Sequence, residues 1–243
     1  MLKAVFIDMD DTLLATTALY EVAKDKFKTW MAPYGVTREE LESVYNQAER
    51  DNFKIYGYSR ARFPASFEKT LKHFIPEATP EMIAEVRSFG EQVFETEAAL
   101  LPGTEEAIAL LMEQYPVYLV TQGDQSVQTP RIAQLPFADK LSGIFIIEEK
   151  SQETFEKIAA QLGYAPGDVV MIGDSLKSDI KPAIAAGLQA VWVEHHNWKM
   201  MENASHTAPP EAKRFPTLLE AARDLTGGPA PSARKNGMPL PPP

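Results

Sequence analysis

Cysteine is absent from the 243-residue sequence, which excludes disulfide bonds, cysteine metal sites and cysteine nucleophiles. Long hydrophobic runs are absent as well, because no apolar stretch approaches the ~18 residues of a membrane-spanning helix. The first residues carry one lysine and then reach Asp8, so they lack the apolar segment of a secretory leader. We therefore expect a soluble, cytoplasmic protein without a membrane partner.

Basic residues are fewer than acidic ones, because the sequence has 24 Lys and Arg but 34 Asp and Glu, and its net charge is −10. This balance argues against nucleic acid as a partner. An anionic substrate would therefore need local positive charge from a metal ion or a lysine. Hydrophobic residues make up 44% of the chain, enough for a folded core over most of its length. Residues 226–243 are rich in Pro and Gly, which predicts a disordered tail.

Two aspartates follow the first apolar run of the chain. The run 2–7 is typical of a buried strand, and Asp8 and Asp10 come directly after it. Side chains at i and i+2 of an extended segment point the same way, so the two carboxylates would repel each other. A cation or a proton would relieve this repulsion, and a carboxylate nucleophile beside an acid–base group requires such a pair. The alternative is a polar turn in which Thr12 caps a helix.

Three more polar groups follow short apolar runs. In chain order they are Thr121 and Gln122 after 117–120, Lys150 after 144–147, and Asp174 after 169–172. The carboxyl ends of parallel strands meet at one edge of a sheet. We therefore expect all of these groups to converge with Asp8 and Asp10 at one site.

Strand-like runs alternate with helical stretches in the second half of the chain. This alternation predicts an α/β fold with a parallel sheet and right-handed crossovers. The expected strands are 117–120, 144–147, 169–172 and 190–193, and the expected helices are 104–114, 126–135, 152–162 and 178–186.

The interval between Asp8 and Thr121 is far longer than one βα unit needs. Apolar positions within it recur at helical spacing. We therefore predict an inserted helical cap over residues 15–98, with a core formed by 1–14 and 99–225. The predicted helices of the insert are 19–31, 38–53, 65–74 and 80–94.

Taken together, the motifs resemble those of the haloacid dehalogenase-like (HAD) phosphohydrolase superfamily. The resemblance rests on the Asp-Met-Asp-Asp-Thr run at 8–12, Thr121, Lys150, and Gly-Asp-Ser at 173–175 with Asp179, and further on 101–104, Gln128 and Arg131. It implies a Rossmann-like parallel sheet with helices on both faces and a helical cap between the first and second motifs.

The resemblance also implies a mechanism. Asp8 would be the nucleophile that attacks phosphorus to form an aspartyl-phosphate. Asp10 would protonate the leaving alcohol and then activate the water that cleaves the acyl-phosphate. Mg²⁺ is the implied cofactor, because a hard cation cancels the repulsion where two anions meet. Its implied ligands are Asp8, Asp174 and the backbone carbonyl of Asp10.

The same resemblance assigns phosphate binding to the hydroxyl of Thr121 and to the turn at Gln122. Lys150 would balance the charge on Asp8 and on the phosphoryl group, although Ser151 stands where the family often has proline. A solvated surface lysine is the alternative for Lys150, and a helix N-cap is the alternative for Thr121.

Asp179 lies five residues after Asp174, near the start of a predicted helix. The resemblance places it beside the metal and Lys150, and pure capping of the helix dipole is the alternative. The adjacent His195 and His196 would point to opposite faces of a strand, which argues against a zinc site made by both.

Phosphomonoester hydrolysis of a small phosphorylated metabolite is the function that these residues favour. Asp10 argues against dehalogenation, because a halide leaves without protonation. A phosphotransferase or sugar-phosphate mutase would use the same motifs, and a non-catalytic phospho-acceptor module would need neither Asp10 nor the insert. The substrate and the oligomeric state do not follow from these residues.

Within the insert, residues 53–63 combine three basic residues with aromatic ones around Gly57. Arg60 and Arg62 are the candidates for recognising the leaving group of the substrate. A solvated loop between two helices is the equal alternative.

Overall fold

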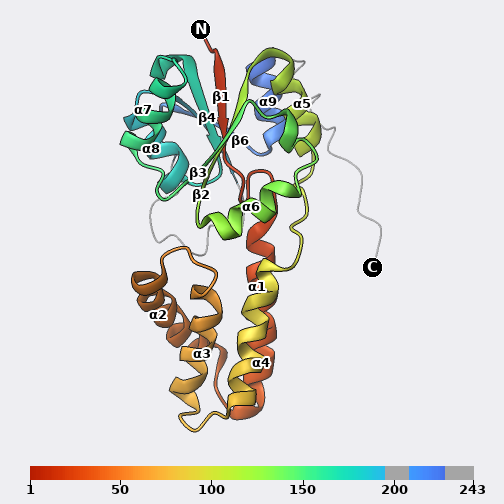
Figure 1. The fold of residues 1–243 in the computed structure, drawn as a ribbon, viewed down its shortest axis with the longest axis vertical. Helices are drawn as coiled ribbons and strands as arrows, with labels where there is room; N and C mark the ends of the chain where they lie inside the picture. Colours follow the sequence, from red (N-terminus) through yellow and green to blue (C-terminus); the bar gives the residue numbers. More distant parts are fainter. Residues whose placement is uncertain (195–207, 228–243) are drawn as a thin grey trace.

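The computed structural model describes residues 1–194 and 208–227. Figure 1 shows an α/β part at one end and a helical part, residues 16–94, at the other. His195, His196 and the predicted tail from residue 228 onward lie outside the described residues.

The sheet has six strands in the described residues, in the order β3-β2-β1-β4-β5-β6. Every pairing is parallel, which confirms the predicted α/β fold. The strands are β1 (Ala4–Ile7), β2 (Val117–Gln122), β3 (Gly143–Ile147), β4 (Val169–Gly173), β5 (Gln189–Val193) and β6 (Ala212–Phe215). At the centre, Ile7 lies between Leu119 and Ile172, so the chain segments that follow β1, β2 and β4 leave the sheet at the same edge.

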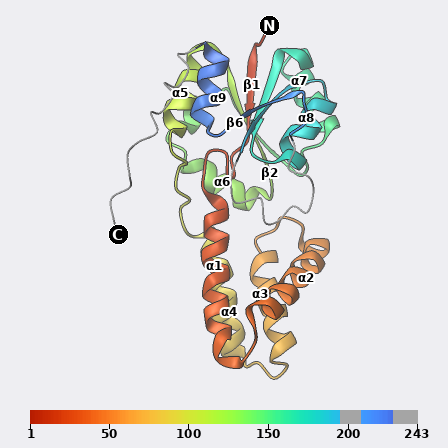
Figure 2. The ribbon, with the colours of Figure 1, turned by 180° about the vertical axis from the view of Figure 1, so that it is seen from behind.

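Helices cover both faces of the sheet. They are α5 (Thr104–Gln114), α6 (Gln125–Ala133), α7 (Gln152–Gln161), α8 (Lys181–Ala185) and α9 (Leu218–Thr226). Val5 and Ile7 belong to the hydrophobic cluster that includes α5 and α9, whereas Ala4 and Phe6 belong to the one that includes α7 and α8. Figures 1 and 2 show these two pairs of helices on opposite faces. Because β1 is buried on both faces, its residues are apolar at every position.

Two departures from the sequence prediction lie after β4. The pattern predicts one helix over 178–186, whereas a single π-helical turn over Leu176–Ile180 precedes α8. In this turn the N–H of Ile180 bonds to the carbonyl of Ser175, five residues earlier. Pro182 follows at the start of α8 and has no N–H to extend the earlier ladder. Such turns are frequent at functional sites, and Asp179 lies within this one.

The second departure is the pair β6 and α9, which the sequence analysis does not predict. β6 is an edge strand whose Lys213 and Arg214 are exposed, so its apolar pattern is weak. α9 begins at a Thr217 cap and ends at Gly227 in the left-handed conformation. The predicted tail therefore starts too early, because Thr226 still belongs to α9.

The helical part consists of α1 (Thr16–Met31), α2 (Arg38–Tyr56), α3 (Arg62–Phe74) and α4 (Pro80–Glu91), followed by a 3₁₀ turn (Gln92–Phe94). It has a hydrophobic cluster of its own, in which the rings of Phe27 and Phe67 stack at 4.6 Å between centroids. Thr37 and Thr79 cap the starts of α2 and α4. We propose that this part is the inserted domain, on the support of its separate cluster.

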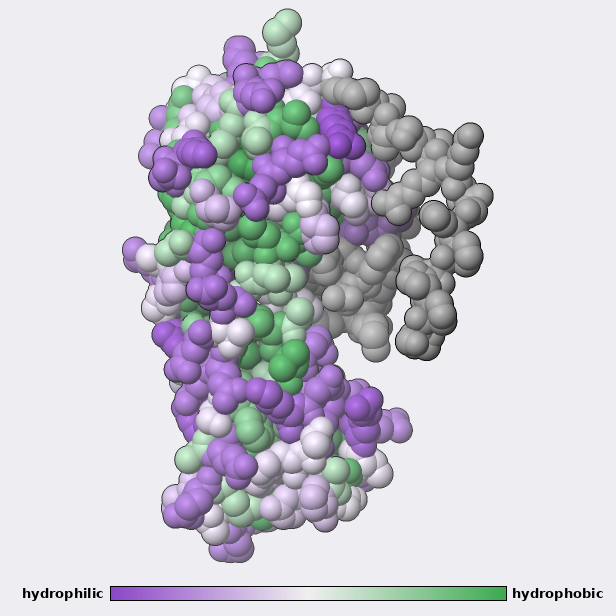
Figure 3. All heavy atoms as spheres, turned by 90° about the vertical axis from the view of Figure 1, so that its right-hand side faces the viewer, coloured by the Kyte–Doolittle hydropathy of each residue, from purple (hydrophilic) through white to green (hydrophobic). Residues whose placement is uncertain are grey.

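No helix of the described residues is long and apolar enough to span a membrane. Figure 3 shows a surface of mixed character on the side that carries α5 and α9, with much hydrophilic surface over the lower, helical end. The predicted cytoplasmic location stays a prediction.

Candidate active site

Asp8 stands directly after β1 and is buried. Its Oδ1 accepts a hydrogen bond from the ammonium group of Lys150. Its Oδ2 accepts one from the hydroxyl of Thr12, at 3.2 Å. Two donors therefore hold this carboxylate in place, and the surrounding protein separates it from bulk water.

Lys150 joins two carboxylates. Its Nζ donates to Asp8 and also to Oδ1 of Asp179, at 2.5 Å. The Lys150 side chain is only 3% exposed, so it is a buried cation and not a solvated surface lysine. Oδ2 of Asp179 accepts the backbone N–H of Ser175 at 2.9 Å, so both oxygens of Asp179 are occupied.

Gly173, at the end of β4, leaves room for this arrangement. A Cβ atom at this position would collide with the carboxyl group of Asp179. The absence of a side chain thus lets Asp179 pack against the strand end and reach Lys150.

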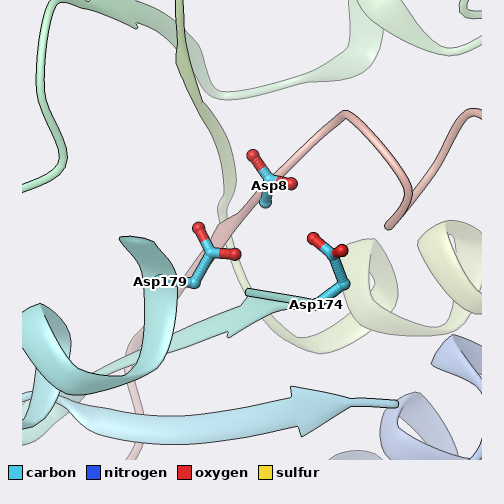
Figure 4. A group of neighbouring side chains, drawn as sticks. All are labelled: Asp8, Asp174 and Asp179. Atoms are coloured by element: carbon cyan, nitrogen blue, oxygen red, sulfur yellow. The ribbon is translucent and has the colours of Figure 1, made fainter. Parts of the chain in front are cut away.

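Asp174 follows Gly173 and is also buried. Figure 4 shows the side chains of Asp8, Asp174 and Asp179 gathered around a common space, and one oxygen from each of them lies within 4.8 Å of the other two. The Thr12 hydroxyl lies 3.4 Å from Oδ1 of Asp174. Oδ2 of Asp174 is buried and has no hydrogen-bond partner among the described residues.

The electrostatics of this cluster favour an added positive charge. Burial raises the pKa of Asp8 to about 7. The positive charge of Lys150 lowers this pKa in part, and the negative charges of Asp179 and Asp10 raise it further. Burial also raises the pKa of Asp174 well above its ordinary value, and the charge of Asp179 adds to this effect. For Lys150, burial lowers the pKa, but Asp179 and Asp8 outweigh it and raise the pKa overall. Three buried carboxylates therefore lie around one ammonium group, which contacts only Asp8 and Asp179.

A hard divalent cation fits this donor set. Such ions prefer carboxylate oxygens. A buried oxygen without a bonding partner, such as Oδ2 of Asp174, is rare in proteins unless an ion or ligand binds it. Asp8 and Asp174 offer the available lone pairs, because Asp179 is already bonded on both oxygens. The carbonyl of Asp10 stays a predicted further ligand.

Thr121 and Gln122 are the last two residues of strand β2, beside this cluster. Thr121 is fully buried, and its Oγ1 accepts a hydrogen bond from Nε2 of Gln128 at 2.7 Å. The side chain of Gln122 accepts the backbone N–H of Lys150 at 3.2 Å and donates to the hydroxyl of Tyr58 at 2.7 Å. Gln122 therefore connects the loop of Lys150 with the helical part.

Asp10 does not share the contacts of Asp8. Its Oδ2 accepts from Nε2 of Gln128 at 2.7 Å, and its Oδ1 accepts from Arg131 at 3.0 Å. Arg131 also donates to the hydroxyl of Tyr20 in α1, at 3.2 Å. Gln128 and Arg131 are three residues apart on α6 and so face the same side of the helix. In the sequence, only the family resemblance points to Gln128 and Arg131, and it assigns them no role.

A cavity of about 320 Å³ lies between the α/β part and the helical part. Asp10, Gln128 and Arg131 line it from the α/β side, and Tyr45 and Arg62 are among its lining residues from the helical side. A substrate bound in it would reach Asp10 directly.

The two predicted cap arginines have different surroundings. Arg62 lines the cavity, and its guanidinium lies over the rings of Phe53 and Tyr58 at 5.3 and 5.7 Å. Arg60 is not among the lining residues, and its guanidinium lies 5.4 Å from the Phe94 ring centroid. Their part in substrate recognition stays a prediction.

Comparison with known proteins gives the same family as the motifs. Residues 2–187 match the family model described as haloacid dehalogenase-like hydrolase. The chain is 26% identical to a glyceraldehyde 3-phosphate phosphatase from Pyrococcus furiosus, over 83% of this chain and 84% of the relative. It is also 26% identical to a pyrimidine 5'-nucleotidase from Streptococcus pneumoniae, over 90% of this chain and 94% of that relative.

The fold is similar to that of a haloacid dehalogenase-like family hydrolase from Xanthomonas campestris. The two structures superpose with a TM-score of 0.79 at 23% sequence identity, over 93% of this chain and 91% of the other. This likeness concerns the fold. Because the family model spans most of the sequence, the chain belongs to the haloacid dehalogenase-like hydrolases.

Proposed function

We propose that this chain is a Mg²⁺-dependent phosphomonoester hydrolase that acts on a small phosphorylated metabolite through an aspartyl-phosphate on Asp8. The observation that carries the proposal is the buried Asp8, paired with Lys150 and adjacent to an unpartnered oxygen of Asp174. The names of two relatives, a glyceraldehyde 3-phosphate phosphatase and a pyrimidine 5'-nucleotidase, support the substrate class.

In the first step, a carboxylate oxygen of Asp8 attacks phosphorus and the bond from phosphorus to the ester oxygen breaks. Asp10 gives its proton to the departing oxygen, which leaves as an alcohol. Gln128 and Arg131 donate to the two oxygens of Asp10, so they hold its carboxyl group in position.

In the second step, water attacks the phosphorus of the aspartyl-phosphate. Asp10, now ionised, takes a proton from this water, and the bond from phosphorus to Asp8 breaks to release inorganic phosphate. Asp10 and Asp8 return to their starting forms, so the cycle closes without another reactant.

The phosphoryl group would be held by Thr121 and Lys150. Oγ1 of Thr121 accepts from Gln128, which leaves the hydroxyl proton of Thr121 available to a phosphate oxygen. Lys150 supplies a fixed positive charge beside Asp8 and the transferring group. Asp8, Asp174 and the carbonyl of Asp10 would hold Mg²⁺. When bound, the ion supplies positive charge that lowers the repulsion between the two anions.

Two other reactions use related chemistry. A dehalogenase needs no proton for its leaving group, whereas here two side chains are committed to orienting Asp10. A phosphotransferase or sugar-phosphate mutase would pass the phosphoryl group from Asp8 to a second alcohol. Product analysis separates both from hydrolysis, since only hydrolysis releases inorganic phosphate in water alone.

The test is release of phosphate from p-nitrophenyl phosphate, with Mg²⁺ and after treatment with EDTA. Asp8→Asn should lower kcat on the order of 10⁴-fold or more, because it removes the nucleophile and keeps the shape. Asp168→Asn is the matched control, since Asp168 pairs with Lys3 on the surface, and it should keep full activity. Wild-type activity in Asp8→Asn, or activity that survives EDTA unchanged, would overturn the proposal.

A further inference from the structure

The cavity beside Asp10 contains most of the unpartnered polar atoms of the described residues. In the described part of the chain, five buried side-chain atoms have no hydrogen-bond partner, and Oδ2 of Asp174 in the carboxylate cluster is one of them. The other four are Tyr45 Oη, Glu49 Oε1, Arg62 Nε and Gln128 Oε1, and all four residues line the cavity. A buried polar group without a partner costs free energy, so their collection in one cavity indicates a polar ligand.

Three of these atoms lie in the helical part and offer complementary hydrogen bonds. Oε1 of Glu49 accepts, and Nε of Arg62 donates. Arg62 Nε lies 3.5 Å from the other oxygen of Glu49, which places the acceptor and the donor side by side. Burial keeps the pKa of Tyr45 well above its ordinary value, so its hydroxyl remains neutral and can donate or accept.

The charges of the cavity argue against a second anionic group on the ligand. Lys24 is paired with Glu21 at 2.9 Å, Arg131 with Asp10 at 3.0 Å, and Arg62 with Glu49. Each of these three lining cations therefore already has an acidic partner. A carboxylate or second phosphate would have to displace one of these partners before it gained a counterion.

The size of the cavity and the residues that line it further restrict which ligand it can bind. Its volume of about 320 Å³ is within the range of ~300–1,000 Å³ typical of ligand pockets. Tyr20, Phe63 and Phe94 line it with aromatic surface, suited to the apolar face of a ring. A three-carbon alcohol would fill only part of this space and leave the polar atoms near Glu49 without partners.

We infer that Tyr45, Glu49 and Arg62 bind the leaving group of the substrate, and that this group is a neutral ring compound with a hydrogen-bond donor and an acceptor at its far end. A monosaccharide and a nucleoside both carry this chemistry. The inference rests on the proposed phosphatase function and narrows its substrate class.

The experiment measures kcat/KM for glucose 6-phosphate, cytidine 5'-monophosphate, glycerol 1-phosphate, 3-phosphoglycerate and p-nitrophenyl phosphate. We expect one of the first two to be the best metabolite substrate, and which one it is decides between sugar and nucleoside. Glu49→Gln should lower kcat/KM for that substrate on the order of ten- to a hundred-fold. It should change p-nitrophenyl phosphate hydrolysis by less than about two-fold, because a nitrophenyl group has no donor for Glu49.

The matched control is Glu42→Gln on the same helix, because Glu42 also forms an ion pair, with Lys28, but does not line the cavity. Calorimetric binding of free glucose and cytidine to wild type and to Glu49→Gln tests the site without turnover. A preference for 3-phosphoglycerate or glycerol 1-phosphate, or an equal loss for every substrate in Glu49→Gln, would overturn the inference. If p-nitrophenyl phosphate is not hydrolysed by wild type, the proposed function fails, and the calorimetric comparison still decides the inference.

Discussion

The two parts of the molecule line one cavity, and three of the four buried, unpartnered polar atoms of its lining residues belong to the helical part. On the α/β side, Asp10 is bonded on both oxygens, to Gln128 and Arg131. On the helical side, Tyr45 and Glu49 present atoms without partners. Polar groups that already have hydrogen-bond partners are held in position, whereas groups without partners can bond to a ligand that enters the cavity. The difference supports our proposal that the α/β part carries out the reaction and that the helical part selects the substrate.

The largest expected effect is on the α/β side. Asp10→Asn removes the proposed acid, so hydrolysis of alkyl phosphates should fall by as much as about 10⁴-fold. p-Nitrophenolate leaves without a proton, so in Asp10→Asn the rate of its release in the first turnover should fall much less than the rate for an alkyl phosphate. Rapid-quench measurement of both substrates checks this. Equal losses for aryl and alkyl phosphates in the first step would remove Asp10 from that role.

A change within the helical core should affect stability and not the chemistry. Phe67 is fully buried and stacks on Phe27, so Phe67→Ala should lower the free energy of unfolding by about 3–5 kcal/mol. Denaturant titration followed by circular dichroism measures this loss. If the two parts unfold as separate units, the helical transition should shift and that of the α/β part should not. A single shifted transition would show that they unfold together.

A smaller effect is expected where the two parts meet. Arg131 holds Asp10 and also contacts Tyr20 of α1, so Arg131→Met should misplace the proposed acid and lower kcat by about 10- to 100-fold. The loss should be greater for alkyl than for aryl phosphates. Tyr20→Phe is the control, because it removes only the contact to the helical part. Similar losses in both variants would indicate that the contact between the parts, and not the position of Asp10, is responsible.

The smallest expected effect is a shift in melting temperature with pH. Because burial raises the pKa of Asp8 to about 7 and also raises that of Asp174, the folded state prefers their protonated forms. Their contribution to stability is therefore present at low pH and is lost as pH rises from about 4 through 7. Mg²⁺ would offset this loss, so it should raise the melting temperature more at pH 8 than at pH 5. Asp174→Asn should abolish the difference, and a pH-independent increase would contradict the proposed ligands.

The α/β part could be predicted from the sequence, because each motif residue follows a short apolar strand. Residues at the ends of parallel strands converge whatever the intervening loops do, so the placement of Asp8, Thr121 and Asp174 at one edge of the sheet follows from the sequence. Only the family resemblance points to Gln128 in the sequence, because its bond to Asp10 depends on how α6 packs. The strand β6 was missed because an exposed edge strand has little apolar alternation to detect.

The polar residues of the helical part could not be predicted in the same way. Tyr45 and Glu49 lie four residues apart on α2, a spacing that serves equally for packing or for a solvated face. Their placement in the cavity follows from how α2 packs against its neighbours, and no local pattern encodes that. Arg62 was suggested by its position in a basic, aromatic segment, which does not distinguish it from Arg60.

The lack of a side chain at Gly173 affects residues outside β4. Any larger residue there would push Asp179 away from the strand end, and Lys150 would lose one of its two carboxylate contacts. Lys150 would then be free to shift toward or away from Asp8, which would change the electrostatic environment of the proposed nucleophile. The surroundings of Asp8, our proposed nucleophile, thus depend on a residue that has no side chain and does not contact it.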